Sequence, residues 1–309
     1  MLFGIESTLE IQIMIGVFFI IVLYAINIMW IKFGAMVQNA TTIAKLIPLI
    51  LFAVCGIIFG DPKPLITESH NIVSNASWIA AITPIAFAFD GWIIATSISH
   101  EIKNAKRNLP LALIASPIFI LIIYIAYFIG ISLYVGPEQI TALGDQNLYV
   151  AAQNLLGHWG AKIVLTFVVV SVIGTVNGLI IGSIRNPQSL AIRKMIPFSK
   201  TFAKSNTKYR ISLTSAALSL TCVLICMAAH YATQKFGLLG TSDISEISIV
   251  MNYIGYIVLY IQVIKLFVKG KIKGKFKGII VPVCAIFGSA IMLIGGLQNK
   301  MFILYARTP

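Results

Sequence analysis

Eight long apolar segments constrain the fold of this chain more than any other feature of its sequence. Each is a continuous run of about 20 residues or more, which is the length that an α-helix needs to cross roughly 30 Å of hydrocarbon. The segments lie at residues 11–30, 37–59, 78–101, 111–135, 161–184, 211–231, 246–267 and 276–298. A transmembrane β-barrel would instead show strands of about ten residues in which apolar and polar side chains alternate. The sequence therefore predicts an all-α fold, a polytopic membrane helical bundle of about eight transmembrane helices.

The composition and charge pattern agree with this prediction. The chain is 58% hydrophobic and only 11% charged, whereas soluble domains carry about 25% charged residues. Its net charge of +13 comes mainly from basic residues that follow the third, fifth and seventh apolar segments, while most acidic residues lie in the alternate loops. Because basic loops face the cytoplasm, this charge orients the chain in the lipid bilayer and does not indicate a nucleic-acid partner. We expect a multi-pass protein of the cell membrane, and the heavy use of Ile, Lys and Asn indicates a bacterial plasma membrane.

No pattern typical of an enzyme or a metal site occurs in the sequence. The four cysteines lie in apolar segments without CxxC spacing, so neither a disulfide framework nor a zinc site is predicted. His100 and Glu101 resemble the start of an HExxH metal helix, but Asn104 stands where the second histidine is needed. No phosphate-binding glycine loop and no G-x-S-x-G motif is present. We therefore expect no enzymatic activity, no cofactor and no metal ligand.

The hexapeptide FAFDGW, residues 87–92, interrupts the third apolar segment. Asp90 costs roughly 2.5 to 3.5 kcal/mol at the centre of a membrane helix, and Gly91 weakens a helix by about 1 kcal/mol relative to Ala. A helix broken at mid-membrane is how secondary transporters expose backbone groups to a polar substrate. The motif therefore predicts a binding site. In the alternative interpretation, Phe87, Phe89 and Trp92 are simply core or lipid-facing aromatic residues.

Three segments carry a resemblance to a known family. The run FAFDGWIIATSISHEIKNAKRNLP, residues 87–110, resembles the sixth helix and following cytoplasmic loop of the amino acid, polyamine and organocation permeases. It is most similar to the branch that contains L-amino-acid transporters and bacterial serine/threonine exchangers. VQNATTIAKLIPL, residues 37–49, resembles the fifth helix of that family, and GTVNG, residues 174–178, resembles the eighth. The resemblance implies a fold of two inverted five-helix repeats and transport of an amino acid substrate by alternating access.

The resemblance also implies an incomplete copy of the permease. Family members have twelve helices, and the eight apolar segments align with the fourth to the eleventh. We therefore expect residues 1–309 to form a single membrane permease domain that is a fragment, with the missing permease segment as a partner. The alternative function is a non-transporting remnant or a subunit of a split permease.

By position in the family motif, the resemblance implies roles for five consecutive residues. Phe87 would be the aromatic gate over the bound amino acid, and Ala88, Phe89 and Gly91 would offer backbone carbonyls to its ammonium group. For Asp90 two roles stay open. Its carboxylate contacts a cationic substrate or a proton, or it caps the half-helix that follows.

Three further residues enter the predicted site. The resemblance implies that the Lys45 ammonium occupies the place where sodium-coupled relatives hold a cation, which predicts sodium-independent coupling. The alternative is a snorkelling lysine whose head group reaches the membrane surface. Asn177 and Gly178 lie in the middle of the fifth apolar segment, where they border the site or only let helices approach closely.

Overall fold

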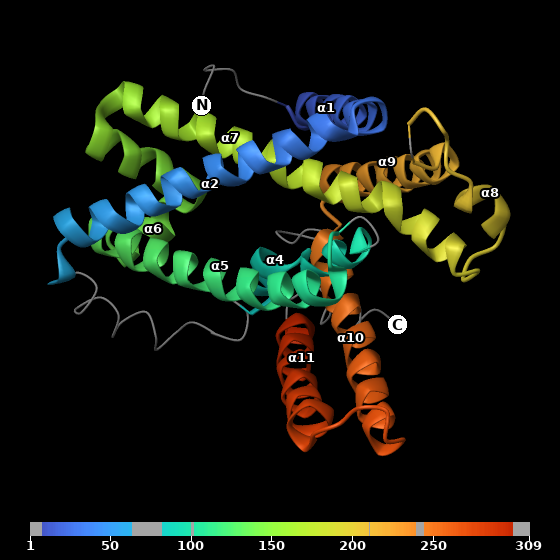
Figure 1. Ribbon diagram of the computed structural model, residues 1–309. Helices are drawn as coiled ribbons and strands as arrows, with labels where there is room; N and C mark the ends of the chain where they lie inside the picture. Colours follow the sequence, from blue (N-terminus) through green and yellow to red (C-terminus); the bar gives the residue numbers. More distant parts are fainter. Residues whose placement is uncertain (1–7, 64–81, 100–101, 210, 239–243, 299–309) are drawn as a thin grey trace. The chain divides into compact units, whose positions relative to one another are not determined.

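The computed structural model describes residues 8–63, 82–99, 102–209, 211–238 and 244–298, and these residues form helices and no β-strand (Figure 1). Seven of the described helices are long and apolar enough to cross a membrane. They are α1 (Leu9–Met29), α2 (Ile31–Phe59), α5 (Ala105–Val135), α7 (Asn147–Ile192), α9 (Leu213–Lys235), α10 (Ile244–Val268) and α11 (Val281–Gln298). The predicted all-α membrane fold is confirmed. The third predicted span is interrupted within its described residues, 82–99.

The first two spans are separated by one non-helical residue. Thr8 caps α1, because its hydroxyl oxygen accepts a hydrogen bond from the backbone N–H of Ile11 at 3.4 Å. Trp30 has φ −135° and ψ 71°, which ends α1, and α2 starts at the next residue. α2 is 29 residues long and so measures about 43 Å. It begins six residues earlier than the sequence predicts, at Ile31 rather than at Val37.

Prolines and one glycine shape the longest helices. Pro48 lies inside α2, Pro117 inside α5 and Pro187 inside α7, and each removes one backbone hydrogen bond of its helix. Gly157, with φ 71° and ψ −178°, separates α7 into a short first segment and a long second one. The predicted span 161–184 lies wholly in the second segment.

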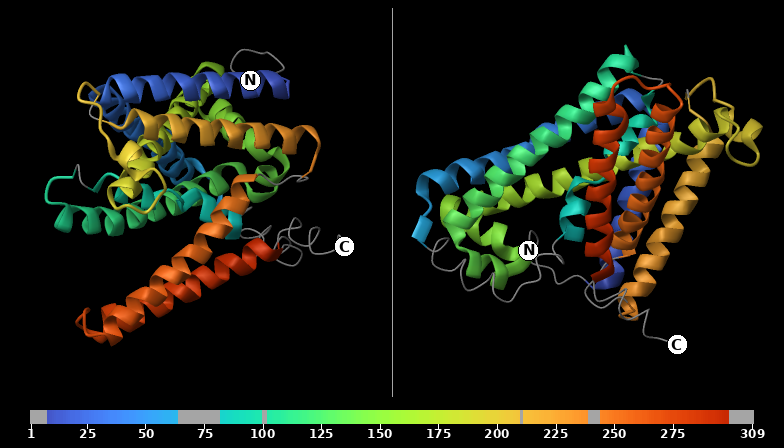
Figure 2. Two further views of the ribbon diagram at one scale, coloured as in Figure 1. Left: turned by 90° about the vertical axis from the view of Figure 1, so that its right-hand side faces the viewer. Right: turned by 90° about the horizontal axis from the view of Figure 1, so that it is seen from below.

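The chain divides into two compact units, and each is described by itself. The first consists of residues 1–75 and 91–227, and the second of residues 76–90 and 228–309. In the second unit, α10 and α11 lie side by side as a hairpin in every view (Figures 1 and 2), and α4 (Ile82–Phe89) contacts both of them. The remaining short elements are α6 (Pro137–Leu143), η3 (Gly144–Gln146), α8 (Ser199–Ala203) and the π-helical turn η4 (Phe276–Ile280).

Two buried clusters hold the first unit together. One joins α1, α7 and the start of α9, and the other joins α2, α5 and α7. Their members are Leu23, Tyr24, Ile180, Ile184, Ile211 and Ala216 in the first cluster, and Phe52, Ile131, Ala151, Ala152, Ala161 and Val164 in the second. Beside the second cluster, α2 and α5 approach so closely that a Cβ atom at Gly56 would overlap the backbone of Gly130. Such small-residue contacts are how membrane helices pack, because lipid gives them little hydrophobic drive to associate.

Large apolar side chains cover the outside of both units. Phe18 on α1, Phe128 on α5 and Phe287 on α11 are all exposed, together with many isoleucines on the same helices. In water this much exposed apolar surface would be unfavourable. The surface therefore suits a hydrocarbon solvent, as the hydropathy of the helices requires.

Candidate functional site

The predicted interruption of the third apolar segment is present in the structure. α4 ends at Phe89, Asp90 and Gly91 form a turn, and the short 3₁₀-helix η1 (Trp92–Thr96) follows. Gly91 has φ 94° and ψ −8°, a left-handed conformation that costs other residues roughly 1 to 2 kcal/mol. The helix therefore breaks where the sequence supplies the one residue type that adopts this turn without strain.

The backbone hydrogen bonds around the break are short-range. The N–H of Asp90 donates to the carbonyl of Phe87 at 3.2 Å, and the N–H of Ile94 donates to the carbonyl of Gly91 at 3.1 Å. Both bonds span three residues rather than the four of an α-helix. The N-cap residue of η1 is Gly91, which has no side chain, so Asp90 does not occupy the capping position.

Two of the three aromatic residues of the motif are exposed. Phe87 is 55% exposed and Trp92 is 40% exposed. Ala88 and Asp90 are also exposed, and Phe89 is half-buried. The exposure of Phe87 and Trp92 is compatible with both the gate and the lipid-facing interpretations.

Lys45 lies at the centre of α2, 14 residues from each end of the helix. It is half-buried and lines a cavity of about 500 Å³ between α2 and α5. The other lining residues are Thr42, Leu46, Leu49, Ala115, Ser116, Phe119, Ile120, Ile123 and Tyr124. None of them is acidic, so the lining of the cavity holds a positive charge without a carboxylate. Along the helix axis, Lys45 lies about 21 Å from either end of α2.

Two polar residues that precede Lys45 on α2 show which helix this side of α2 contacts. Gln38 and Thr41 pack against α7, where Gly178 and Gly174 leave room for them. Lys45 follows Gln38 by seven residues, or about two turns, and so belongs to nearly the same face of α2. Lys45 therefore lies near the border between the α7-facing and the α5-facing sides of α2.

Asn177 is fully buried, with 0% of its surface exposed. Its side-chain oxygen accepts a hydrogen bond from Nδ2 of Asn27 at 2.7 Å. Its own Nδ2 donates to the carbonyl of Gly34 and to Oε1 of Gln38, both at 3.2 Å. These bonds join α1, α2 and α7. Because both amide donors of Asn177 are engaged within the protein, the geometry favours the packing role over a place at the border of the site.

Three glycines form a stripe along the same helix. Gly174, Gly178 and Gly182 recur at every fourth residue of α7, and a Cβ atom at Gly178 would lie 3.0 Å from Nε2 of Gln38. At Gly174 it would overlap the side chain of Thr41, and at Gly182 that of Ile94 in η1. The sequence signal for this contact is the repeated G-x-x-x-G spacing. It extends the GTVNG motif by one further glycine that the motif alone does not include.

A second polar contact was not anticipated from the sequence. The hydroxyl of Tyr24 is 2.7 Å from the Ser219 hydroxyl and 3.1 Å from the Ser183 hydroxyl. Tyr24 and Ser219 are buried, so α1, α7 and α9 share a small network of hydroxyl groups. Asn27 and Asn177 likewise hydrogen-bond across helices.

The predicted site residues are divided between the two compact units. Gly91, Lys45, Asn177 and Gly178 belong to the first unit, and Phe87 to Asp90 belong to the second. Within the first unit, Gly178 and Asn177 both contact α2 on the face that Lys45 shares.

A multi-pass helical membrane protein with a helix broken at a glycine and with interhelical polar contacts has the features of a secondary transporter. The chain belongs to the amino acid permease family, whose sequence pattern matches residues 2–303. The resemblance inferred from the three sequence segments is thereby confirmed.

Individual relatives agree with this family. The serine/threonine exchanger SteT of Bacillus subtilis (strain 168) is 30% identical over 286 residues, which are 90% of this chain and 62% of SteT. The human b(0,+)-type amino acid transporter 1 is 29% identical over 167 residues, which are 52% of this chain and 33% of the transporter. The cystine/glutamate transporter of Pongo abelii is 23% identical over 181 residues, 56% of this chain and 34% of that protein. The chain thus spans less than two thirds of the length of each of these relatives.

Proposed function

We propose that the protein is a permease of the cell membrane that moves amino acids by alternating access and that it catalyses no chemical reaction. The observation that carries this proposal is the broken helix at Asp90 and Gly91 in a chain of the amino acid permease family. The names of the relatives, an exchanger and amino acid transporters, support a transported amino acid. In this proposal residues 1–309 act as one permease domain.

The end of α4 would bind the ammonium group of the substrate. The partial negative charge at a helix C-terminus favours a cation. Here the backbone of Ala88, Phe89 and Gly91 supplies that environment, and Asp90 adds a carboxylate. Because Gly91 occupies the capping position of η1, we assign Asp90 to the substrate ammonium or a proton.

Phe87 would act as the aromatic gate. Its ring is 55% exposed at the end of α4, so it is available to cover a bound ligand. An aromatic face over an ammonium group contributes about 0.5 to 2 kcal/mol. Removing the ring should therefore weaken binding without affecting membrane insertion, since α4 keeps its other apolar residues.

Lys45 would take the place of a coupling sodium ion. Its half-buried ammonium lies in the middle of a membrane helix, in a cavity whose lining holds no carboxylate. A fixed positive charge in that position repels a sodium ion and supplies the same charge. Transport is then independent of sodium. In the same proposal Asn177 and Gly178 hold α7 against α2 and do not contact the substrate.

Ligand binding by the purified chain tests this function. The chain is placed in lipid nanodiscs, and a panel of labelled amino acids is screened by scintillation proximity. Phe87→Ala should weaken the binding of the best ligand by about three- to thirtyfold, the equivalent of the cation–π contact. Phe287→Ala, at a side chain that is 71% exposed in the same unit, is the matched control and should leave binding unchanged. Absence of binding to any amino acid by a well-folded chain, or equal affinity of the Phe87 variant, contradicts the proposed site.

A further inference from the structure

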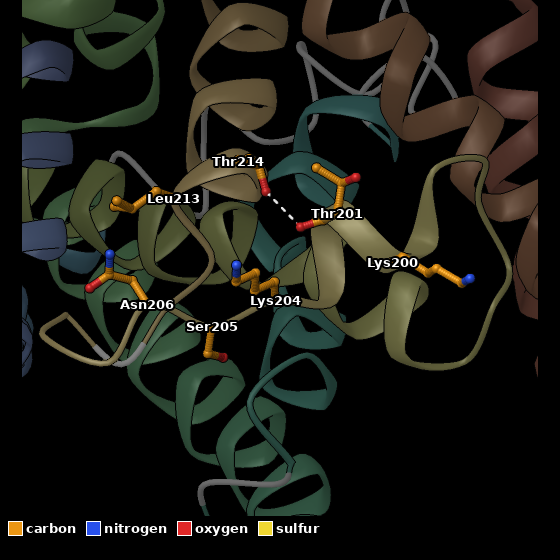
Figure 3. A pocket seen from close by; sticks show the side chains of 7 residues that line it. All are labelled: Lys200, Thr201, Lys204, Ser205, Asn206, Leu213 and Thr214. Atoms are coloured by element: carbon orange, nitrogen blue, oxygen red, sulfur yellow. Dashed lines mark hydrogen bonds between the residues drawn. The ribbon is translucent and has the colours of Figure 1, made fainter.

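The segment that joins α7 to α9 encloses a cavity of about 450 Å³ in the first unit (Figure 3). Six of its seven lining residues are polar or basic. They are Lys200, Thr201, Lys204, Ser205, Asn206 and Thr214, with Leu213 as the seventh. In Figure 3 the Lys204 side chain lies among the other lining residues, whereas Lys200 extends outward. The lining offers ammonium, hydroxyl and amide donors and no carboxylate.

The segment that forms this cavity carries basic residues and no acidic one. No Asp or Glu occurs between Asp145 and Asp243, while six basic residues lie between Arg193 and Arg210. No acidic side chain therefore lies within 50 residues of Lys204 on its N-terminal side or within 30 on its C-terminal side. The cavity is suited to an anion from outside the chain.

Internal hydrogen bonds turn two polar side chains into donors toward the cavity. Oδ1 of Asn206 accepts from the backbone N–H groups of Lys208 at 2.9 Å and Tyr209 at 3.2 Å. The acceptor side of this amide is therefore occupied, and its NH₂ group remains to donate. The Ser205 hydroxyl oxygen accepts from Nε2 of Gln188 at 2.7 Å, which leaves the hydroxyl hydrogen to donate. This arrangement favours a ligand that only accepts, such as a phosphate group.

The cavity lies at the edge of a membrane-spanning helix. Leu213 and Thr214 are the first two residues of α9, which is 23 residues long and apolar enough to cross the bilayer. Lipid head groups occupy roughly 5 to 8 Å beyond each end of the hydrocarbon core. On the same segment Phe198 is 80% exposed, and an exposed aromatic side chain next to basic residues is typical of an element lying in the membrane interface. The position favours a phosphate carried by a lipid over one dissolved in water.

We propose that this cavity binds the phosphate group of an anionic phospholipid. Lys204 pairs with the phosphate oxygens, and Ser205 and Asn206 donate hydrogen bonds to them. Lys200 approaches from the rim, and the side chain of Leu213 contacts the start of the acyl chains. The site shares no residue with the broken helix, and the proposal does not depend on the transported substrate.

Native mass spectrometry in a neutral detergent tests the proposal with short-chain phosphatidylglycerol as the probe. The wild-type chain should retain one tightly bound lipid. Lys204→Gln should weaken this binding about fivefold, and the double variant with Lys200→Gln up to about 25-fold, which corresponds to the usual contribution of basic residues to anionic-lipid binding. Lys204→Arg should retain most of the affinity because it keeps the charge.

Lys208→Gln is the matched control. Lys208 lies on the same segment but outside the cavity lining, and its ammonium nitrogen is 5.3 Å from the centroid of the Tyr209 ring. The Lys208→Gln variant loses the same charge as Lys204→Gln, and its affinity for phosphatidylglycerol should change by less than about twofold. Equal losses for Lys208→Gln and Lys204→Gln would mean that the cavity has no special role. Inorganic phosphate and phosphatidylcholine form the other two arms, and phosphate binding as tight as that of the lipid would overturn the lipid assignment.

Discussion

Nδ2 of Asn27 lies 2.7 Å from Oδ1 of Asn177, although 150 residues separate the two in the chain. The same Nδ2 group also donates to the carbonyl of Leu23 at 2.9 Å. Gly34 makes room for this pair, since a Cβ atom there would overlap Oδ1 of Asn27. Two buried amides therefore fix the positions of α1, α2 and α7 around a single polar contact.

The Asn27 and Asn177 side chains should be energetically coupled. Asn27→Ala and Asn177→Ala each remove an interhelical hydrogen bond, and such bonds in membranes contribute about 0.6 kcal/mol on average and up to about 1.7. We expect each variant to be destabilised and the double variant to be less destabilised than the sum by an amount in this range. The free energies of unfolding of the wild type, the two single variants and the double variant are measured in mixed dodecylmaltoside and SDS micelles. Strictly additive effects would show that the pair has no direct coupling.

The glycine stripe of α7 predicts a position-dependent response to alanine. Gly182→Ala should destabilise the first unit by about 1 to 3 kcal/mol, because the new methyl group overlaps Ile94. Ile94→Ala in the same chain should restore part of the loss, since it removes the overlapping atom. Gly255→Ala on α10 is the control, as nothing lies within 4 Å of a Cβ atom there. That control should be neutral or slightly stabilising, given the helix propensity of Ala.

The turn at Gly91 should discriminate between substitutions by their backbone preference. Gly91→Ala should destabilise the chain by about 1 to 2 kcal/mol, because φ is 94° at this residue. Gly91→Asn should be less harmful, since Asn adopts left-handed conformations more readily. Thermal unfolding monitored by tryptophan fluorescence gives the order of stability of the wild type and the two variants. A more stable Gly91→Ala variant would indicate that the break is not a fixed feature of the fold.

Sodium should have no effect on amino acid binding. Replacing sodium with choline should change the affinity of the wild-type chain by less than about twofold. Lys45→Gln should lower binding or transport by about tenfold, because the site then lacks a cation. Lys32→Gln removes the same charge from the exposed first turn of α2 and serves as the control. A sodium requirement in the wild-type chain would contradict the role of Lys45.

The charge pattern of the loops predicts the orientation of the chain. In a background without the four native cysteines, Lys106→Cys should react with an impermeant thiol reagent only after the cells are permeabilised. Gln139→Cys, in an acidic loop on the opposite side, should react in intact cells. The reverse pattern of labelling would show that the basic loops lie outside.

The sequence by itself determined which segments become helices and where one of them breaks. Apolar runs of this length must satisfy their backbone hydrogen bonds internally in a membrane, so helices follow directly. Gly91, with φ 94°, lies at the break that the FAFDGW motif predicts, whereas the break at Gly157, with φ 71°, was not predicted. Helix ends were less predictable, because α2 begins at Ile31 and includes Lys32 and Gly34, which the hydropathy pattern leaves outside the predicted span.

Only the tertiary structure decided which faces of these helices meet. In a helix of a soluble protein, a stripe of polar residues marks the solvent-facing side. In a membrane, lipid-facing and buried residues are both apolar, so the hydropathy pattern does not show which side of a helix faces its neighbours. The pairing of Asn27 with Asn177 and of Gly174 with Thr41 could not be read from spacing for that reason. Lys45 was recognisable as a buried charge, but its cavity exists only because α5 packs beside α2.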